Sequence, residues 1–204
     1  MTPDPTRALA LNCTLKTGSE ASSTEVLCRQ MLEELEQHGV TGDLVRVADL
    51  NIKPGVTSDE GDGDEWPDLR RRILNAGILI VGTPIWLGQP SSVCKRVLER
   101  MDAFLGETDD EGRMVSYDRV AILATVGNED GAHHVAAEVY QALNDCGYTI
   151  PAAAQAYWVG EAAGSIDYQD LEKVPDSTGG MIETAARHAA HLTRLLVADP
   201  YPAG

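Results

Sequence analysis

The stretch that decides the fold is Ile78-Leu79-Ile80-Val81-Gly82-Thr83-Pro84-Ile85-Trp86-Leu87-Gly88-Gln89-Pro90-Ser91-Ser92. The four apolar residues before Gly82 predict a strand buried on both faces, which is typical of a parallel sheet. The carboxyl end of such a strand is where open α/β sheets bind ligands. Trp86 and Leu87 offer a broad apolar surface there, and Gly88 lets the backbone approach a ligand closely. We therefore expect this loop to form the floor of a site for a planar, conjugated ligand.

Strand and helix patterns alternate along the rest of the chain, which predicts a parallel sheet with helices on both faces. The other apolar runs predict strands at 8–12, 43–47 and 117–125 and within 148–159. Helical spacing predicts helices from about 22 to 39, 66 to 77, 92 to 104, 132 to 147 and 181 to 196. Five strands in this alternation fit a three-layer, flavodoxin-like, doubly wound parallel sheet of strand order 2-1-3-4-5. We expect one domain over residues 1–204, with a core at about 8–197 and a frayed tail at 198–204.

The 2-1-3-4-5 order brings the ends of the first, third and fourth strands to one crevice. The first of these loops runs from Asn12 to Thr24, is rich in hydroxyls and ends where a helix begins. Helix N-termini bind anions through free N–H groups and the helix dipole. Candidate ligands for a phosphate are the hydroxyls of the loop and one ammonium group: Thr14, Lys16, Ser22, Ser23 and Thr24. The alternative is that these hydroxyls only cap the helix, and the spacing of Ser22 and Glu25 fits a capping box.

Composition excludes several classes of partner. The net charge of −16 argues against nucleic acid and anionic membrane surfaces as partners.

The N-terminus lacks the apolar segment of a signal peptide, so we expect a cytoplasmic protein. The four cysteines are scattered and do not have the spacing of a metal or iron–sulfur site, so we expect buried free thiols and no metal site. The acidic run at 59–65 lacks the offsets of a calcium loop and is interpreted as a solvated surface loop.

Motifs of competing nucleotide and hydrolase folds are missing from the sequence. There is no GxGxxG after the first strand and no GxxxxGK[ST] loop, which argues against a dinucleotide-binding Rossmann domain and a P-loop NTPase. There is also no GxSxG elbow for an α/β-hydrolase serine.

Taken together, the three loops resemble those of the flavodoxin-like superfamily, and most closely the NADPH-dependent FMN reductase group. Ser22-Ser23-Thr24 stands where that group has a Ser-x-Thr phosphate loop. Pro84-Ile85-Trp86-Leu87-Gly88 is similar to the group's Pro-x-aromatic-x-Gly loop at the isoalloxazine ring. Thr125-Val126-Gly127-Asn128, continuing to Gly131, is similar to its Thr-Gly-Gly turn, with Val126 in place of one glycine. The resemblance covers roughly residues 8–158.

The resemblance implies FMN as cofactor and NAD(P)H as electron donor. Hydride would pass through flavin N5 to a small-molecule acceptor such as a quinone or another flavin. The chemistry would belong to the flavin, so we assign no catalytic side chain. The resemblance also implies a homodimer or homotetramer, because members of the group often complete the flavin pocket across an interface. Two alternatives stay open, namely a flavodoxin-type electron carrier without its own substrate and a scaffold that has lost its flavin.

Overall fold

The inner strands of the central sheet have side chains buried on both faces. This computed structural model describes residues 3–203. Five strands form the parallel path β2-β1-β3-β5-β6, and a short β4 pairs antiparallel with β3. They are β1 (Asp4–Asn12), β2 (Thr41–Arg46), β3 (Ala76–Trp86), β4 (Gln89–Pro90), β5 (Val120–Gly127) and β6 (Gln155–Val159). With the hairpin strand β4 set aside, this is the predicted order 2-1-3-4-5, and the flavodoxin-like prediction is confirmed.

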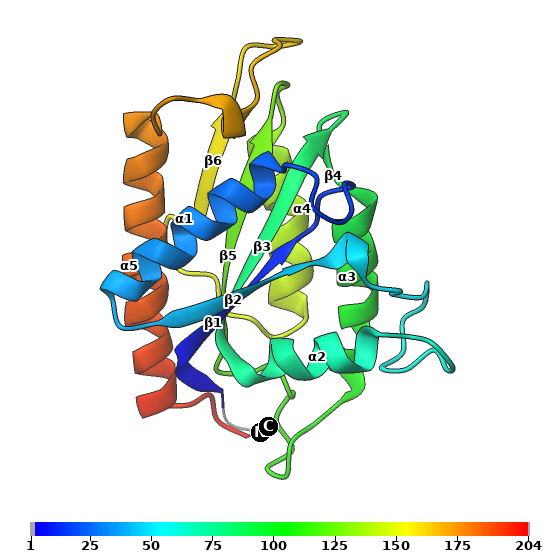
Figure 1. Cartoon of the computed structure of the whole chain (residues 1–204). Helices are drawn as coiled ribbons and strands as arrows, with labels where there is room; N and C mark the ends of the chain where they lie inside the picture. The colour runs from blue at the N-terminus through cyan, green and yellow to red at the C-terminus, as the bar shows by residue number, and fades with distance from the viewer. Residues whose placement is uncertain (1–2, 204) are drawn as a thin grey trace.

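Helices cover both faces of the sheet (Figure 1). They are α1 (Ser23–Gln37), α2 (Trp66–Asn75), α3 (Ser92–Met101), α4 (Ala132–Asp145) and α5 (Asp176–Ala198). Side chains alternate between two cores along each strand, as Leu9 and Ala10 illustrate. The core on one face contains residues of α2, α3 and α4, and the core on the other contains residues of α1 and α5. Among residues 3–203, no helix has both the length and the apolar character that a bilayer crossing requires.

One predicted strand begins later than expected and another occupies only the last part of its predicted range, because the backbone turns before each of them. Asp118 has φ +66° and Ala153 has φ +54°, and a left-handed residue interrupts an extended strand. The fourth predicted strand therefore begins at Val120, and the fifth begins at Gln155. The prediction of an open loop after Gly82 was wrong, because β3 continues to Trp86 and returns as β4.

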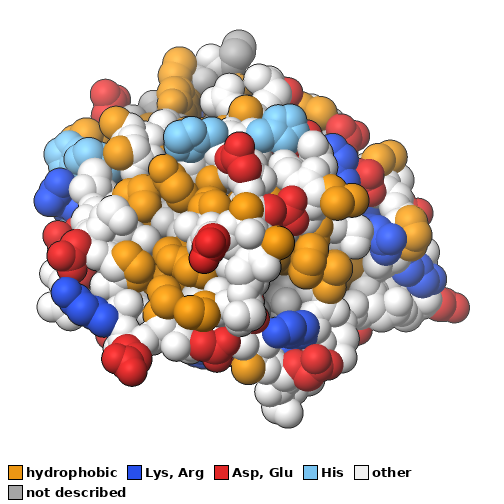
Figure 2. All heavy atoms as spheres, turned by 90° about the horizontal axis from the view of Figure 1, so that it is seen from above, with side chains coloured by type: hydrophobic (Ala, Val, Ile, Leu, Met, Phe, Trp, Pro, Cys, Tyr) orange, Lys and Arg blue, Asp and Glu red, His pale blue; other side chains and the backbone are white. Residues whose placement is uncertain are grey.

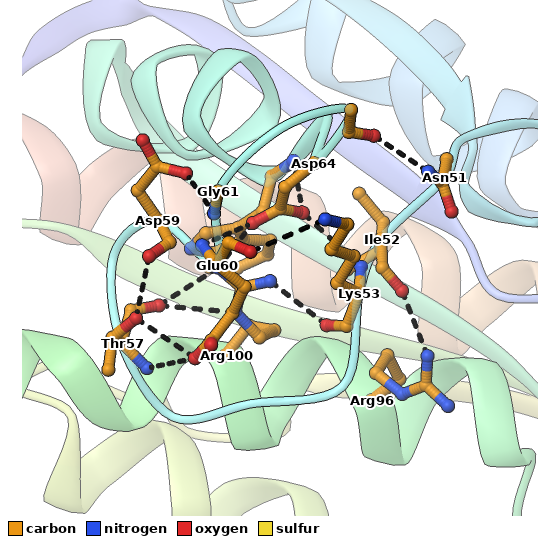
Figure 3. A network of polar contacts seen from close by, with 12 residues as sticks. Asn51, Ile52, Lys53, Thr57, Asp59, Glu60, Gly61, Asp64, Arg96 and Arg100 are labelled. Atoms are coloured by element: carbon orange, nitrogen blue, oxygen red, sulfur yellow. Dashed lines mark hydrogen bonds and ion pairs between the residues drawn. The ribbon is translucent and has the colours of Figure 1, made fainter.

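The loop between β2 and α2 is only partly the solvated loop that its acidic sequence predicts. The side chains of Asp64 and Arg100 are fully buried and form an ion pair of 2.8 Å (Figure 3). Arg100 also donates to the carbonyl oxygens of Lys53 and Thr57. Its guanidinium carbon lies over the Trp66 ring, 5.4 Å from the ring centroid. A residue of α3 thus fastens this loop to the body of the domain.

The C-terminal tail is not wholly frayed, contrary to the prediction. The backbone N–H of Tyr201 donates to Asp118 at 2.8 Å, and its ring packs against Tyr117 with centroids 5.6 Å apart. The four cysteines are free and buried, as the sequence predicted. Burial raises the pKa of Cys28 to about 12, so this thiol is not a nucleophile at neutral pH.

Candidate functional site

The first wall of the site is the loop between β1 and α1. The hydroxyl of Ser22 accepts a hydrogen bond from the Glu25 N–H at 3.2 Å, which makes Ser22 the N-cap of α1. The ammonium of Lys16 donates to the Ala21 carbonyl at 2.7 Å, so the loop folds back over itself. This folding gathers hydroxyl groups at the positive end of the α1 dipole, which is the arrangement that a phosphate group requires.

Glu25 does not complete the predicted capping box. Its carboxylate instead binds Arg46 at 2.5 Å and Arg29 at 2.6 Å. Burial opposes ionisation, but the hydrogen bonds from Arg46 and Arg29 outweigh it and lower the pKa of Glu25. The acidic side chain at the start of α1 is thus neutralised by two arginines, which reduces its repulsion of an anion bound nearby.

The second wall is a β-hairpin formed by β3 and β4. Ile85 pairs with Pro90 and Trp86 with Gln89, which leaves Leu87 and Gly88 as a two-residue turn. Both turn residues have positive φ, +53° and +75°, as a type I′ turn requires. The two carboxylate oxygens of Glu129 accept the N–H groups of Leu87 and Gly88 at 3.0 and 2.9 Å. The third loop therefore holds the second one in place.

The third wall combines the end of β5 with the segment that follows β6. The side-chain amide of Asn128 donates to Asp167 at 3.1 Å, and its backbone carbonyl accepts from Ala163 at 3.0 Å. The rings of Trp158 and Tyr168 pack with centroids 5.6 Å apart. The Tyr168 hydroxyl in turn donates to Gln30 of α1 at 2.5 Å. This wall therefore reaches from β5 across to the helix that carries the first loop.

The three walls enclose one cavity of about 300 Å³. Eleven of the predicted site residues line it: Thr14, Lys16, Ser22, Ser23, Thr24, Pro84, Ile85, Trp86, Val126, Gly127 and Asn128. The other four do not. The side chain of Thr125 is buried and accepts from Gln155 at 3.2 Å, whereas Leu87 and Gly88 form the tip of the hairpin. Gly131 lies beneath that tip, where a Cβ would come within 2.8 Å of the Gly88 Cα.

Sequence reasoning missed five lining residues, which are Leu15, Glu129, Trp158, Asp167 and Tyr168. Leu15 and Glu129 lie in two of the loops that the sequence predicts to bind the ligand, so their positions in the chain could have identified them. Trp158 is the penultimate residue of β6, and its strand pattern alone does not distinguish a site residue from a packing residue. Asp167 and Tyr168 lie in a stretch without periodicity, and only the tertiary structure brings them to the site.

The cavity fits the FMN that the resemblance implies. Its lining combines hydroxyls at a helix N-terminus, which suit a phosphate, with Trp86 and Trp158, which suit a flat ring. The Asn128 Oδ1 atom is buried and has no hydrogen-bond partner among residues 3–203. An unpaired buried acceptor is unfavourable, and a ring bearing an N–H group is the kind of ligand that would satisfy it.

Apolar side chains gather on the face that carries the strand ends (Figure 2). Five large apolar residues in the loops and at the strand ends of this face remain exposed, namely Leu15, Trp86, Leu87, Val159 and Ile166. Leu87 is 92% exposed and Trp86 is 54% exposed. Concentrations of exposed apolar surface of this kind mark ligand or protein contacts.

A family model described as NADPH-dependent FMN reductase matches residues 6–164. The chain is also 34% identical over 207 residues to 8-demethyl-8-aminoriboflavin-5′-phosphate synthase of Streptomyces davaonensis, covering 96% of this chain and 80% of that protein. The crystal structure of RosB with bound 8-demethyl-8-formylriboflavin-5′-phosphate is similar at a TM-score of 0.86 and 34% identity, covering 96% of this chain and 81% of that one.

Two further similarities support less, one because it covers a small part of the relative and the other because its sequence identity is low. A divalent metal cation transporter MntH of Mycobacterium bovis is 40% identical over 194 residues, but the chain spans only 28% of that protein's length. The apo structure of the NADH:FMN oxidoreductase EMOB has a TM-score of 0.64 at 18% identity, covering 95% of this chain and 91% of that one. At this identity the likeness shows the shared fold alone.

Proposed function

The chain belongs to the NADPH-dependent FMN reductase family, and we propose that it holds FMN in the cavity between its three loops and passes hydride from NAD(P)H to a small-molecule acceptor. Its membership of this family identifies it as an FMN-dependent oxidoreductase. The observation that carries the proposal is that a helix N-terminus and a pair of tryptophans lie at one and the same cavity.

Each wall has a separate task in this proposal. The hydroxyls of Ser22, Ser23 and Thr24 and the start of α1 bind the phosphate of FMN. Trp86 and Trp158 contact the ring and exclude water from its vicinity, while Asn128 accepts a hydrogen bond. When bound, FMN supplies the hydride chemistry itself, so the protein needs only to orient it and leave part of it accessible.

Reconstitution with FMN tests the proposal directly. Purified protein loaded with FMN is expected to retain the yellow chromophore through gel filtration and to lose its visible absorbance when NADH or NADPH is added without oxygen. An electron carrier of the flavodoxin type would bind FMN but would need a partner enzyme for reduction. Protein that neither retains FMN nor gains thermal stability from it would support a scaffold without flavin.

A second candidate treats the flavin as a substrate. It is favoured by the relative that is named for making an aminoriboflavin phosphate, together with the likeness to the RosB structure that contains a formylriboflavin phosphate. Mass spectrometry of the flavin recovered after turnover distinguishes the two. Unchanged FMN supports the reductase, and a modified ring supports flavin modification.

We also propose that the chain forms a homodimer or homotetramer. The support is the exposed apolar residues around the cavity, of which Leu87 is the most exposed. Light scattering coupled to gel filtration tests this, and a monomer at micromolar concentration would contradict it.

A further inference from the structure

The turn between β3 and β4 has an unfavourable residue at its first position. Leu87 has φ +53°, a region that residues with a Cβ atom rarely adopt. Type I′ turns favour asparagine, aspartate or glycine there. Because Leu87 is 92% exposed, burial of its side chain does not compensate for this conformation. Another interaction must therefore stabilise the turn.

That interaction is the carboxylate of Glu129. Its Oε1 accepts the Leu87 N–H at 3.0 Å and its Oε2 accepts the Gly88 N–H at 2.9 Å. Hydrogen bonds to an ionised carboxylate are roughly twice as strong as bonds between neutral groups. Both oxygens are engaged by consecutive amides of the same turn, so the carboxylate fixes the turn in position and in orientation.

The position of Trp86 depends on the same turn. Trp86 precedes the turn directly, pairs with Gln89 across the hairpin and lines the cavity. Glu129 comes from the loop after β5, so it joins two walls of the cavity that are 42 residues apart in sequence. A change in this contact is therefore expected to move the tryptophan relative to the rest of the site.

We infer that Glu129 is a positioning residue for the flavin site: its carboxylate holds the Leu87-Gly88 turn and thereby places Trp86 against the ring. This inference rests on the proposed function, because it assumes that FMN occupies the cavity. It assigns to Glu129 a role that acts through the hairpin rather than through contact with the reacting atoms.

The test begins with Glu129→Gln, whose amide can accept only one of the two N–H groups. Hydrogen exchange is measured on the protein without FMN, and the amides at 86–89 are expected to exchange about tenfold faster than in the wild type. The dissociation constant for FMN is expected to rise about tenfold, and KM for the acceptor to change more than kcat. Glu36→Gln, which removes the same charge from an exposed position near the C-terminal end of α1, is the matched control and is expected to change neither quantity.

Rescue separates positioning from a purely electrostatic role. Leu87→Asn creates the Asn-Gly pair that type I′ turns favour, so it stabilises the turn without Glu129. The double variant Leu87→Asn with Glu129→Gln is therefore expected to recover slow exchange and most of the FMN affinity. If exchange recovers and affinity does not, the charge of Glu129 acts directly and the inference is overturned.

The remaining outcomes are also decisive. Unchanged exchange at 86–89 in Glu129→Gln would show that the carboxylate does not hold the turn. Faster exchange with unchanged FMN affinity and KM would show that the turn does not position the site. If wild-type protein fails to bind FMN, the proposed function is wrong and the inference falls with it. The exchange data would still show separately whether the Glu129 carboxylate holds the Leu87-Gly88 turn.

Discussion

The side-chain amide of Asn128 donates a hydrogen bond of 3.1 Å to the carboxylate of Asp167, which joins the end of β5 to the segment after β6. Both residues line the cavity. The Gly160 N–H also donates to the Gly127 carbonyl at 2.9 Å, and the Ala163 N–H donates to the Asn128 carbonyl at 3.0 Å. These contacts hold the segment at 160–168 as a wall of the site.

Replacing Asp167 by alanine is expected to loosen this wall. The Asn128 amide then retains only its longer contact of 3.4 Å to the Gly164 carbonyl. We expect faster proteolysis within 160–168 and FMN affinity lowered about threefold to tenfold, in line with the loss of one charge-assisted hydrogen bond. Asp170→Ala, at an exposed position beyond the wall, is the control. Equal rates of proteolysis in the two variants would contradict a role of Asp167 in holding the 160–168 segment in place.

The phosphate end of the site is tested by comparing FMN with riboflavin, which lacks the phosphate. We expect riboflavin to bind at least about 100-fold more weakly, because a phosphate at a helix N-terminus gains several charge-assisted hydrogen bonds. Ser23→Ala is expected to weaken FMN binding and to leave riboflavin binding unchanged. Ser19→Ala removes an exposed hydroxyl from the same loop and serves as the control. An equal effect of Ser23→Ala on both ligands would argue against a phosphate contact.

Much of the fold could be predicted from the sequence because its signals are local. The double-sided burial of 78–81 and the hydroxyls at 22–24 depend on neighbouring residues alone. The β3–β4 hairpin could not be predicted, because Leu87 is a poor residue for its turn and the stabilising Glu129 lies far along the chain. Tyr168 was missed for a similar reason, since its contact with Gln30 joins residues 138 positions apart.

Trp86 is expected to contribute to ligand binding far more than to folding. Its side chain is 54% exposed, so truncation removes little buried area within the chain. Trp86→Ala is expected to weaken FMN binding about tenfold or more while the midpoint of thermal unfolding without FMN changes by no more than about 2 °C. Leu105→Ala, which truncates a side chain of 51% exposure beyond α3, is the control for general loss of apolar surface.

Gly180 offers a stabilising change away from the site. It lies inside α5, where an added Cβ would have no heavy atom within 4 Å. Glycine in a helix interior is about 1 kcal/mol less favourable than alanine. Gly180→Ala is therefore expected to raise the free energy of unfolding by about 0.5–1 kcal/mol in a urea titration. A destabilised variant would show that this part of the helix needs the flexibility of glycine.

The buried pair of Asp64 and Arg100 predicts a dependence of stability on pH. Burial alone would raise the pKa of Asp64, but the hydrogen bonds from Arg100 and from the N–H groups of Glu60, Trp66 and Lys53 together hold it well below its usual range (Figure 3). An unfolded aspartate has a pKa of about 3.9. Because the folded pKa is the lower one, the stabilisation is complete above about pH 5 and is lost as the pH falls.

Asp64→Asn removes this contribution and leaves the Arg100 guanidinium buried without its counter-ion. We expect the free energy of unfolding at pH 7 to fall by about 3 kcal/mol or more, the range seen when one partner of a buried ion pair is deleted. The difference in the free energy of unfolding between wild type and variant is expected to shrink as the pH is lowered from 7 to about 3. Only the wild type has an ionised carboxylate at position 64 whose stabilising contribution is lost on protonation. Asp62→Asn, at an exposed position in the same loop, is the matched control and should follow the wild type at every pH. A difference between wild type and Asp64→Asn that stays constant across this range would show that the pair does not control the acid stability of the domain.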